Sequence, residues 1–331
     1  MPTALVLGCN GQDGSYITDI LLERGYDVWG TIRHSSQPNL SRIQHNFNNP
    51  LFKLRSADLT DPGSILRVLL EVEPDEIYNE ADQDHVGYSF HAPQVSVAVT
   101  AGGVATLLEA VKEIHLSRCN NIVGGQIKVF QPVSATMFGD SPAPQNEQSP
   151  INPLSPYACA KAHAYHLCRY YRQCYGMFVS CGIMYNHDSP RRGRDYLLQK
   201  ICRTAVRIAR GSEEYISFDP GTWETRVDIG HAKDYMYGAW KMLQHKEPLD
   251  LILSVERVLV KDMARIAFEY CGIDFKQYSK FSDGPPFRPG PQQNLVGDCS
   301  LAERVIQFDP VEGIRDLIRE IIAQAEKEEM V

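Results

Sequence analysis

The first half of the chain alternates short apolar runs with amphipathic stretches of helical length. The expected strands cover 3–8, 27–33, 52–59, 76–81 and 127–135, and the expected helices cover 15–25, 62–72, 94–114 and 157–175. Strands that alternate with helices at this spacing form a parallel sheet with helices on both faces. Because the crossovers are right-handed, such a sheet is doubly wound and binds ligands at the carboxyl ends of its strands. We therefore predict an α/β fold of this kind.

A glycine-rich stretch, GCNGQDG, follows the first expected strand and leads into the first expected helix. Gly8, Gly11 and Gly14 allow the backbone to turn tightly and to approach a pyrophosphate, which lies at the N-terminus of the helix. A glycine triplet alone is a weak signal. Its place between the first strand and the first helix is the context that a dinucleotide-binding loop requires, so we predict a dinucleotide cofactor.

The end of the second expected strand indicates which dinucleotide binds. An NAD enzyme usually has Asp or Glu there, which bonds the ribose 2′-hydroxyl. This chain has Thr31-Ile32-Arg33-His34-Ser35-Ser36 instead. A cation and two hydroxyls suit a 2′-phosphate, which an acid would repel. The sequence therefore favours NADP over NAD, with a solvated surface arginine as the alternative interpretation of Arg33.

Tyr157 and Lys161 are four residues apart in an expected helix, so both side chains lie on one face of it. The lysine charge lowers the pKa of the phenol, which can then exchange a proton with a substrate hydroxyl near neutral pH. A Y-x-x-x-K pattern is common by chance. It becomes specific in combination with the glycine-rich loop and with Ser134 at the end of an expected strand.

The regular alternation ends near residue 185, where SPRRGRD, DPGTW and later DGPPFRPGPQQN interrupt the pattern. We expect residues 1–184 to form the NADP-binding domain, to which the chain returns around 226–255. Residues 185–331 are expected to form mainly a smaller substrate-binding domain that caps the open edge of the sheet.

The chain has 331 residues and a net charge of −8, and it has no run of Lys and Arg. This argues against a nucleic acid or an anionic membrane as partner, although a few arginines suffice for a diphosphate. Since no basic leader and no window of about 18 uninterrupted apolar residues is found, a cytoplasmic location is expected. The nine cysteines lack C-x-x-C spacing and are expected to be reduced, and His163 and His166 are attributed to a helix surface, so no metal site is expected.

Seven stretches from one end of the chain to the other point to a family. They are GQDGSY at 11–16, DLTD at 58–61, PDEIYN at 74–79, SPYACAKAHAY at 155–165, NHDSPRRG at 186–193, GHAKDY at 230–235 and FRP…LVGD at 287–298. Together they resemble an extended short-chain dehydrogenase/reductase that acts on nucleotide sugars, and more narrowly the GDP-mannose 4,6-dehydratase branch.

The resemblance implies the residues that contact the ligands. The implied cofactor contacts are Gly8, Asn10, Gly11, Gln12, Asp13, Gly14, Arg33, His34, Ser35, Ser36, Asp58, Leu59, Gln83, Tyr157, Lys161, His187 and Arg192. The implied nucleotide-sugar contacts are Asp84, Thr136, Asn186, Lys200, Arg226 and Arg288. Guanidinium groups suit a diphosphate because they bond two oxygens at once, while Arg226 has the alternative of a bridge to Asp228 or Asp234. The resemblance also implies guanine as the base, and a homodimer or homotetramer formed through the helices 94–114 and 157–175.

The chain departs from this branch at four places. The branch carries Thr-x-Glu before the Tyr-Lys helix, whereas this chain has Ser134 and Thr136. Dehydration removes a proton from C5 and the oxygen from C6, and a threonine hydroxyl is far too weak an acid to replace the carboxyl. SATMFGD resembles the matching stretch of UDP-galactose 4-epimerases. Glu80, Asp82 and Asp84 crowd the cofactor and sugar side, and Val95 stands where a tyrosine is usual.

We therefore favour a nucleotide-sugar 4-epimerase that recycles NADP through a transient 4-keto sugar, with Ser134, Tyr157 and Lys161 as catalytic residues. The second hypothesis is a GDP-sugar 4,6-dehydratase in which Asp82 or Asp84 replaces the lost acid. Net oxidoreduction at C4 is a third, and a non-catalytic nucleotide-sugar or NADP(H) sensor is a fourth. The intact Ser134, Tyr157 and Lys161 weigh against the sensor, and the identity of the sugar is not readable from the sequence.

Overall fold

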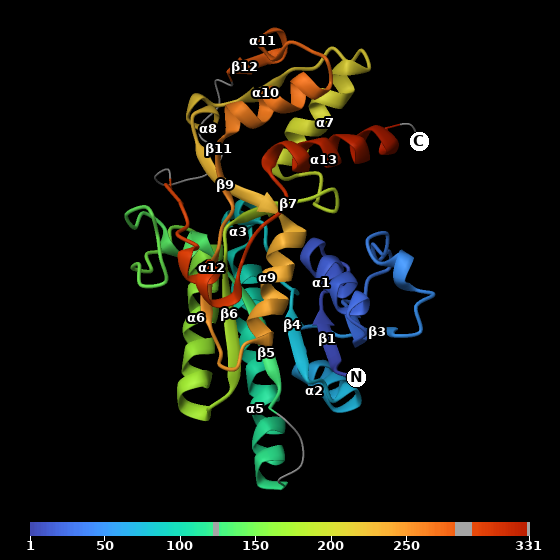
Figure 1. The fold of residues 1–331 in the computed structure, drawn as a ribbon, viewed down its shortest axis with the longest axis vertical. Coiled ribbons are helices and arrows are strands. Elements are labelled where there is room, and N and C mark those ends of the chain that lie inside the picture. Colours follow the sequence, from blue (N-terminus) through green and yellow to red (C-terminus); the bar gives the residue numbers. More distant parts are fainter. Residues whose placement is uncertain (122–125, 282–292, 330–331) are drawn as a thin grey trace.

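A parallel sheet of seven strands forms the centre of the computed structural model, which describes residues 1–121, 126–281 and 293–329 (Figure 1). The strands are β1 (Thr3–Leu7), β2 (Asp27–Ile32), β3 (Phe52–Ser56), β4 (Glu76–Asn79), β5 (Lys128–Ser134), β6 (Phe178–Met184) and β10 (Asp250–Leu253). Their spatial order is β10-β6-β5-β4-β1-β2-β3, and each neighbouring pair is parallel. The order reverses between β1 and β4, which confirms the predicted doubly wound α/β fold.

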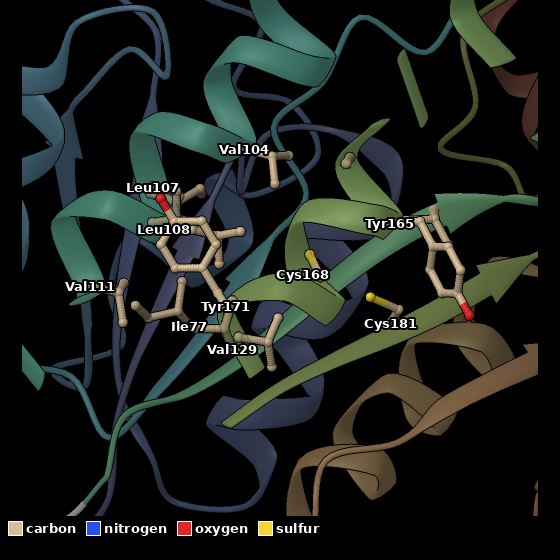
Figure 2. Close-up of a cluster of buried hydrophobic side chains, with 14 of the residues drawn as sticks. Ile77, Val104, Leu107, Leu108, Val111, Val129, Tyr165, Cys168, Tyr171 and Cys181 are labelled. Carbon is tan, nitrogen blue, oxygen red and sulfur yellow. The ribbon is translucent and has the colours of Figure 1, made fainter. Parts of the chain in front are cut away.

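Helices cover both faces of this sheet. One face carries α2 (Pro62–Val72), α5 (Gly103–Asn121) and α6 (Pro156–Tyr175), and the other carries α1 (Gln12–Glu23), α9 (Ala232–Gln244) and α12 (Ser300–Ile306). Figure 2 shows the first of these two cores, where side chains of α5 and α6 meet those of three strands. They are Val104, Leu107, Leu108, Val111, Tyr165, Cys168 and Tyr171 from the helices, and Ile77, Val129 and Cys181 from the strands. Burial of apolar area on both faces is the main term that stabilises this arrangement.

A separate group of elements lies beyond the carboxyl ends of the main strands, at the top of Figure 1. Its helices are α7 (Leu197–Ala209), α8 (Pro220–Trp223), α10 (Val260–Tyr270), α11 (Phe275–Tyr278) and α13 (Ile314–Glu328). Its strands are β7 (Asn186–Asp188), β9 (Arg226–His231) and β11 (Glu256–Leu259) in one sheet, and β8 (Ile216–Phe218) with β12 (Ser279–Phe281) in another. A third apolar cluster holds α7, α10 and α13 together.

The predicted element types are right, but several predicted bounds are wrong. Helix α1 begins at Gln12, inside the glycine motif, and not at residue 15. Strands β3 and β4 end earlier than predicted, at Ser56 and Asn79, although the next amide of each still bonds the neighbouring strand: Ala57 donates to Ile32 of β2, and Glu80 donates to Leu7 of β1. The expected helix 94–114 is the middle of a helical stretch that begins with α3 (Val86–His91) and α4 (Pro93–Ser96) and passes through a π-helical turn (Val97–Gly102) into α5.

Part of this stretch, Pro93–Leu116, is long and apolar enough to cross a membrane by length and composition alone. Half of its most apolar window is buried inside the fold, where α5 packs on α2 and α6. That packing accounts for its apolar character, as expected for a helix of a protein core. The eight cysteines whose side chains are described form no disulfide with one another.

The glycine-rich loop is a tight turn. Gly8 has a φ of +74°, and a Cβ there would lie 2.8 Å from the Ala81 Cα atom after β4. A Cβ on Gly14 would lie only 2.2 Å from the Gly8 carbonyl oxygen. Since both obstacles are backbone atoms, the turn requires glycine at these two positions.

We expect Gly14→Ala to lower the free energy of unfolding by about 2 kcal/mol or more, because the methyl group forces the loop apart. Gly313→Ala is the matched control, since Gly313 has a negative φ of −77° and open space around it. Urea denaturation of the two variants and the parent protein measures the difference. Equal losses in both variants would contradict the steric argument.

Candidate active site

The residues predicted from the sequence gather at the carboxyl edge of the main sheet. Gly8 and Asn10–Gly14 follow β1, Arg33–Ser36 follow β2, Asp58 and Leu59 follow β3, Gln83 and Asp84 follow β4, and Thr136 follows β5, whose last residue is Ser134. Tyr157 and Lys161 lie in the first turns of α6, and Asn186 and His187 open β7 directly after β6. Parallel strands bring these segments to one edge although they are far apart in sequence.

Helix α6 presents the tyrosine and the lysine from a rigid start. Ser155 caps the helix by accepting a hydrogen bond from the Ala158 amide at 3.1 Å, and Pro156 occupies the first turn. Tyr157 and Lys161 are both buried, at 7% and 4% exposure. The Lys161 Nζ donates to the Pro132 carbonyl of β5 at 2.9 Å, which ties the helix to the neighbouring strand.

Ser134 and Thr136 form a small hydroxyl cluster beside the tyrosine. The Thr136 Oγ1 lies 2.9 Å from the Ser134 Oγ, which also accepts a hydrogen bond from the Thr136 amide at 3.2 Å. Ser134 is in turn hydrogen-bonded to Tyr157. The side chains predicted to meet a sugar hydroxyl are therefore brought together.

Asp82 forms a buried ion pair with the active-site lysine, a partner that the sequence did not reveal. Its Oδ2 lies 2.7 Å from the Lys161 Nζ, and the two side chains are 12% and 5% exposed. Its Oδ1 accepts hydrogen bonds from the Thr100 hydroxyl and from the Gln83 amide. Both carboxylate oxygens are thus engaged, which leaves Asp82 poorly placed to act as a free base.

This ion pair changes the electrostatics of the tyrosine. Burial raises the pKa of Tyr157, the Lys161 charge and the Ser134 hydrogen bond lower it, and Asp82 and Asp84 raise it, so the net pKa lies above the ordinary value. Burial lowers the pKa of Lys161, but Asp82 and Tyr157 together raise it by more, so the net pKa of Lys161 is also raised. At neutral pH the phenol is therefore protonated and the lysine charged.

Glu80 adds a second carboxyl group between this centre and the glycine loop. Its Oε1 is buried and, among the described residues, has no hydrogen-bond partner. Burial and the neighbouring Asp13 and Asp82 raise its pKa well above the ordinary value, against the opposing charge of Lys161. Glu80 is therefore the carboxyl group of this cluster that favours its neutral form.

Asp13 and His187 link the glycine loop to β7. The His187 Nε2 lies 2.9 Å from the Asp13 Oδ2, and its Nδ1 lies 2.8 Å from the Tyr185 carbonyl. Burial would raise the pKa of Asp13, but His187 and Arg192 more than offset this and hold it at about 2. Burial lowers the pKa of His187, but Asp13 outweighs it and the net pKa is raised. Each member of the pair thus favours the charged form of the other, and the contact joins the glycine loop to β7 at this edge.

The glycine loop fits a dinucleotide. Gly11 is the N-cap of α1 and supplies no side-chain hydrogen bond, so the first amides of a 12-residue helix are left for an anion. The Gly8 and Cys9 amides bond the Thr31 carbonyl at the end of β2, which brings the exposed Arg33–Ser36 segment next to the loop. A Cβ on Gly8 or Gly14 would fill the turn that a pyrophosphate needs.

Of the residues predicted to hold the nucleotide sugar, some make contacts with neighbouring side chains or backbone and others are exposed. Asp84 forms an ion pair with Arg192 at 3.1 Å, and the Arg192 guanidinium lies over the Tyr196 ring at 3.6 Å. The Asn186 side chain donates to the Asp228 carbonyl at 3.1 Å. Lys200 on α7 and Arg226 on β9 are exposed.

The alternative of a bridge from Arg226 to Asp228 or Asp234 is not found among the described residues. The Asp228 carboxylate accepts from Ser254 at 2.6 Å and from the Val255 amide at 3.1 Å, and Asp234 accepts from the Glu312 amide at 3.2 Å. Arg288 lies outside the described residues.

Three further residues of this region escaped the sequence reasoning. Thr100 holds Asp82, Tyr196 stacks under Arg192, and Arg42 donates to the backbone carbonyls of Asn10 and Arg191 at 3.0 and 2.6 Å. The acid-rich EADQD after β4 was a usable signal for a partner of the buried lysine, because a buried ammonium group needs one. No local sequence pattern indicated that Tyr196 or Arg42 belongs to this region.

The chain is similar along almost its whole length to proteins of one named family. The family profile described as GDP-mannose 4,6 dehydratase matches residues 5–321. GDP-mannose 4,6 dehydratase 2 of Arabidopsis thaliana is 39% identical over 326 residues, which cover 96% of this chain and 85% of the relative. GDP-mannose 4,6-dehydratase of Vibrio cholerae serotype O1 is 36% identical over 353 residues, which cover 97% of this chain and 92% of the relative.

Solved structures of other sugar-nucleotide enzymes share the fold. UDP-glucuronic acid 4-epimerase from Bacillus cereus, solved with UDP-glucuronic acid and NAD, superposes with a TM-score of 0.84 at 20% identity, covering 98% of this chain and 99% of that one. DesIV, a dTDP-glucose 4,6-dehydratase from Streptomyces venezuelae solved with NAD, also gives 0.84 at 20% identity, covering 99% and 98%. Since an epimerase and a dehydratase match equally well, the fold does not separate the two reactions.

We expect Asp82→Ala to lower the free energy of unfolding by about 3 kcal/mol, because it leaves the Lys161 charge buried without its carboxylate. Asp84→Ala is the matched control: Asp84 also pairs with a cation, but its side chain is 49% exposed, and such pairs contribute about 1 kcal/mol or less. Urea denaturation at neutral pH compares the two. Equally small losses would show that the Pro132 carbonyl alone satisfies Lys161.

Proposed function

Because the chain belongs to the GDP-mannose 4,6-dehydratase family, we propose that it is a nucleotide-sugar 4-epimerase. Its substrate in this proposal is a GDP-linked sugar, as for the relatives named above. The observation that carries the proposal is the hydroxyl cluster at Ser134 and Thr136, which keeps the groups for oxidation at C4 and has no carboxyl group at position 136.

The residues at the carboxyl edge have distinct roles in this reaction. Ser134 orients the C4 oxygen, and the phenolate form of Tyr157, which Lys161 stabilises, takes the proton of the C4 hydroxyl and becomes the phenol. A bound nicotinamide dinucleotide supplies the hydride acceptor and donor. Because Asp82 and burial favour the protonated phenol, Tyr157 is well suited to return its proton to the oxygen of the 4-keto sugar. The 4-keto sugar turns within the pocket before it is reduced on its other face.

Dehydration would require a free carboxylate near C5 and C6, and the two candidates from the sequence, Asp82 and Asp84, are engaged elsewhere. Asp82 holds Lys161, Thr100 and the Gln83 amide. Asp84 holds Arg192 and is hydrogen-bonded to Tyr196. The hydroxyl of Thr136 has a pKa far above the range in which it could serve as base. These contacts favour the epimerase over the lyase.

A 4,6-dehydratase is the second candidate. Both curated relatives described above carry that name, at 39% and 36% identity. Glu80 supplies the specific observation in its favour, because its buried carboxyl group has a raised pKa and an oxygen without a partner among the described residues. It lies on the loop after β4, whereas the resemblance implies the dehydratase glutamate at position 136, after β5.

We assign NADP as the cofactor, since Arg33, Ser35 and Ser36 suit a 2′-phosphate and no acid ends β2. We also propose a homodimer or homotetramer built on the helices 94–114 and 157–175. These helices pack against each other and leave Val95, Val97 and Tyr170 exposed, at 39%, 51% and 47%. Exposed apolar side chains on adjacent helices are a common feature of subunit interfaces.

Proton NMR of GDP-mannose and related GDP-sugars, incubated with the protein in deuterated water, tests the reaction. We expect a C4 epimer with almost no deuterium at C5, because the hydride is returned internally. A 6-deoxy-4-keto product carrying deuterium at C5 would establish the dehydratase instead. Accumulation of reduced cofactor at 340 nm, in step with a 4-keto sugar, would indicate net oxidoreduction.

We expect Thr136→Glu to produce some 6-deoxy-4-keto product, because it restores a carboxyl group beside Ser134. Thr136→Gln is the matched control, since it has a similar size and cannot exchange a proton. The same NMR assay measures both variants. If Thr136→Glu and Thr136→Gln give identical product mixtures, the residue at position 136 does not decide between the two reactions.

A further inference from the structure

An arginine-lined cavity of about 670 Å³ lies where α1 and the loop before β3 face α7 and α13. Five arginines line it: Arg42, Arg191, Arg192, Arg194 and Arg203. Glu328, near the end of α13, is the one acidic residue among its lining residues, all of which belong to the described part of the chain. We refer to this cavity as the arginine pocket.

The carboxylates within reach do not balance these five charges. Arg191 pairs with Asp19 at 2.7 Å and Arg192 with Asp84 at 3.1 Å. Arg194 and Arg203 share a single oxygen of Glu328, each at 2.8 Å. Four of the five guanidinium groups therefore share three carboxylates, and Arg42 has no ion pair among the described residues.

Arg42 and Arg203 are the two arginines that the protein satisfies least. Arg42 donates only to backbone carbonyls in its described hydrogen bonds, and burial together with Arg192 and Arg191 lowers the pKa of its guanidinium. Arg203 is 4% exposed, and its buried Nε has no hydrogen-bond partner among the described residues. An unpaired donor on a buried cation is costly unless an acceptor from outside the chain completes it.

The arginine pocket is separate from the predicted cofactor groove. Of the residues predicted to contact the cofactor, Arg192 alone lines it. The glycine loop, Arg33–Ser36, Asp58 and Leu59 are not among its lining residues. Tyr16 lines it from the second turn of α1, where Arg191 lies over the ring at 4.1 Å.

We propose that the arginine pocket is a second ligand site, which binds a diphosphate-bearing anion of about nucleotide size. Arginine is the side chain best suited to phosphate oxygens, since its planar fork bonds two of them at once. The volume lies in the range of about 300–1,000 Å³ that small-molecule sites occupy. Arg203 holds the phosphate at the closed end, and Arg194, with a side chain 67% exposed, meets it at the mouth. The anion links α1 with α7 and α13, which come from distant parts of the chain.

Isothermal titration of inorganic pyrophosphate into the full chain, saturated with its nicotinamide dinucleotide, tests this site. We expect Arg194→Gln to weaken binding about tenfold, because it removes one charge-assisted contact. Glu328→Gln should tighten binding several-fold, because it removes the carboxylate that competes with the anion. Arg319→Gln is the matched control. Arg319 is an exposed arginine of α13, the helix that carries Glu328, and it pairs with Asp316 outside the pocket.

The opposite signs of the Arg194 and Glu328 variants distinguish a ligand site from a structural role, because loss of structure weakens binding in both. Any binding of pyrophosphate at the substrate site is common to all variants and cancels in the comparison. GDP titrated in the same way shows whether a nucleoside adds affinity to the diphosphate. The proposal is overturned if pyrophosphate binding is unchanged in both pocket variants, if both weaken it, or if pyrophosphate merely displaces the dinucleotide.

Discussion

The reversal of strand order between β1 and β4 is the constraint on which the site depends. The chain leaves β1 toward α1 on one face of the sheet and leaves β4 toward α5 on the other face. Backbone atoms of the two connecting loops fill the space between them. The Gly8 and Cys9 amides bond the Thr31 carbonyl at the end of β2, and a Cβ on Gly8 would lie 2.8 Å from the Ala81 Cα atom after β4. The residues that follow each strand are therefore held within a short distance of one helix N-terminus. Glu80 and Asp82 lie beside the glycine loop for this reason.

That crowding explains the electrostatics of the centre. A buried lysine beside a tyrosine normally lowers the pKa of the phenol. Here burial is the largest cause that raises the pKa of Tyr157, and Asp82, which pairs with Lys161 at 2.7 Å, raises it further, so the phenol keeps its proton at neutral pH. The same carboxylate is held by Thr100 from the π-helical turn before α5. A polar network thus follows this buried strand: Asp82 and Asp84 have cationic partners, while the buried Oε1 of Glu80 has no hydrogen-bond partner among the described residues.

The fold and the central part of the site could be predicted from the sequence, whereas the ion pair of Asp82 could not. Alternating apolar runs predicted each strand of the main sheet in the first half, because a buried parallel strand is apolar on both faces. The family resemblance is confirmed. Ser134 and Tyr157, which the sequence analysis placed in one site, are in contact. The Asp82 ion pair was missed because it joins β4 to α6 across 79 residues. The roles of the ligand-binding residues stay predictions, and Lys200 and Arg226 are exposed.

Arg192 belongs both to the edge of the active site and to the arginine pocket. It pairs with Asp84 at the edge of the active site, and it lines the arginine pocket. Its stacking on Tyr196 fixes the plane of the guanidinium, so the same group faces both places without rearrangement. An anion that draws on this charge from the pocket side weakens its hold on Asp84 and thereby changes the field at Tyr157, which Asp84 already affects. If the arginine pocket binds an anion as proposed, the arginine that the resemblance assigns to the cofactor would therefore link the two sites.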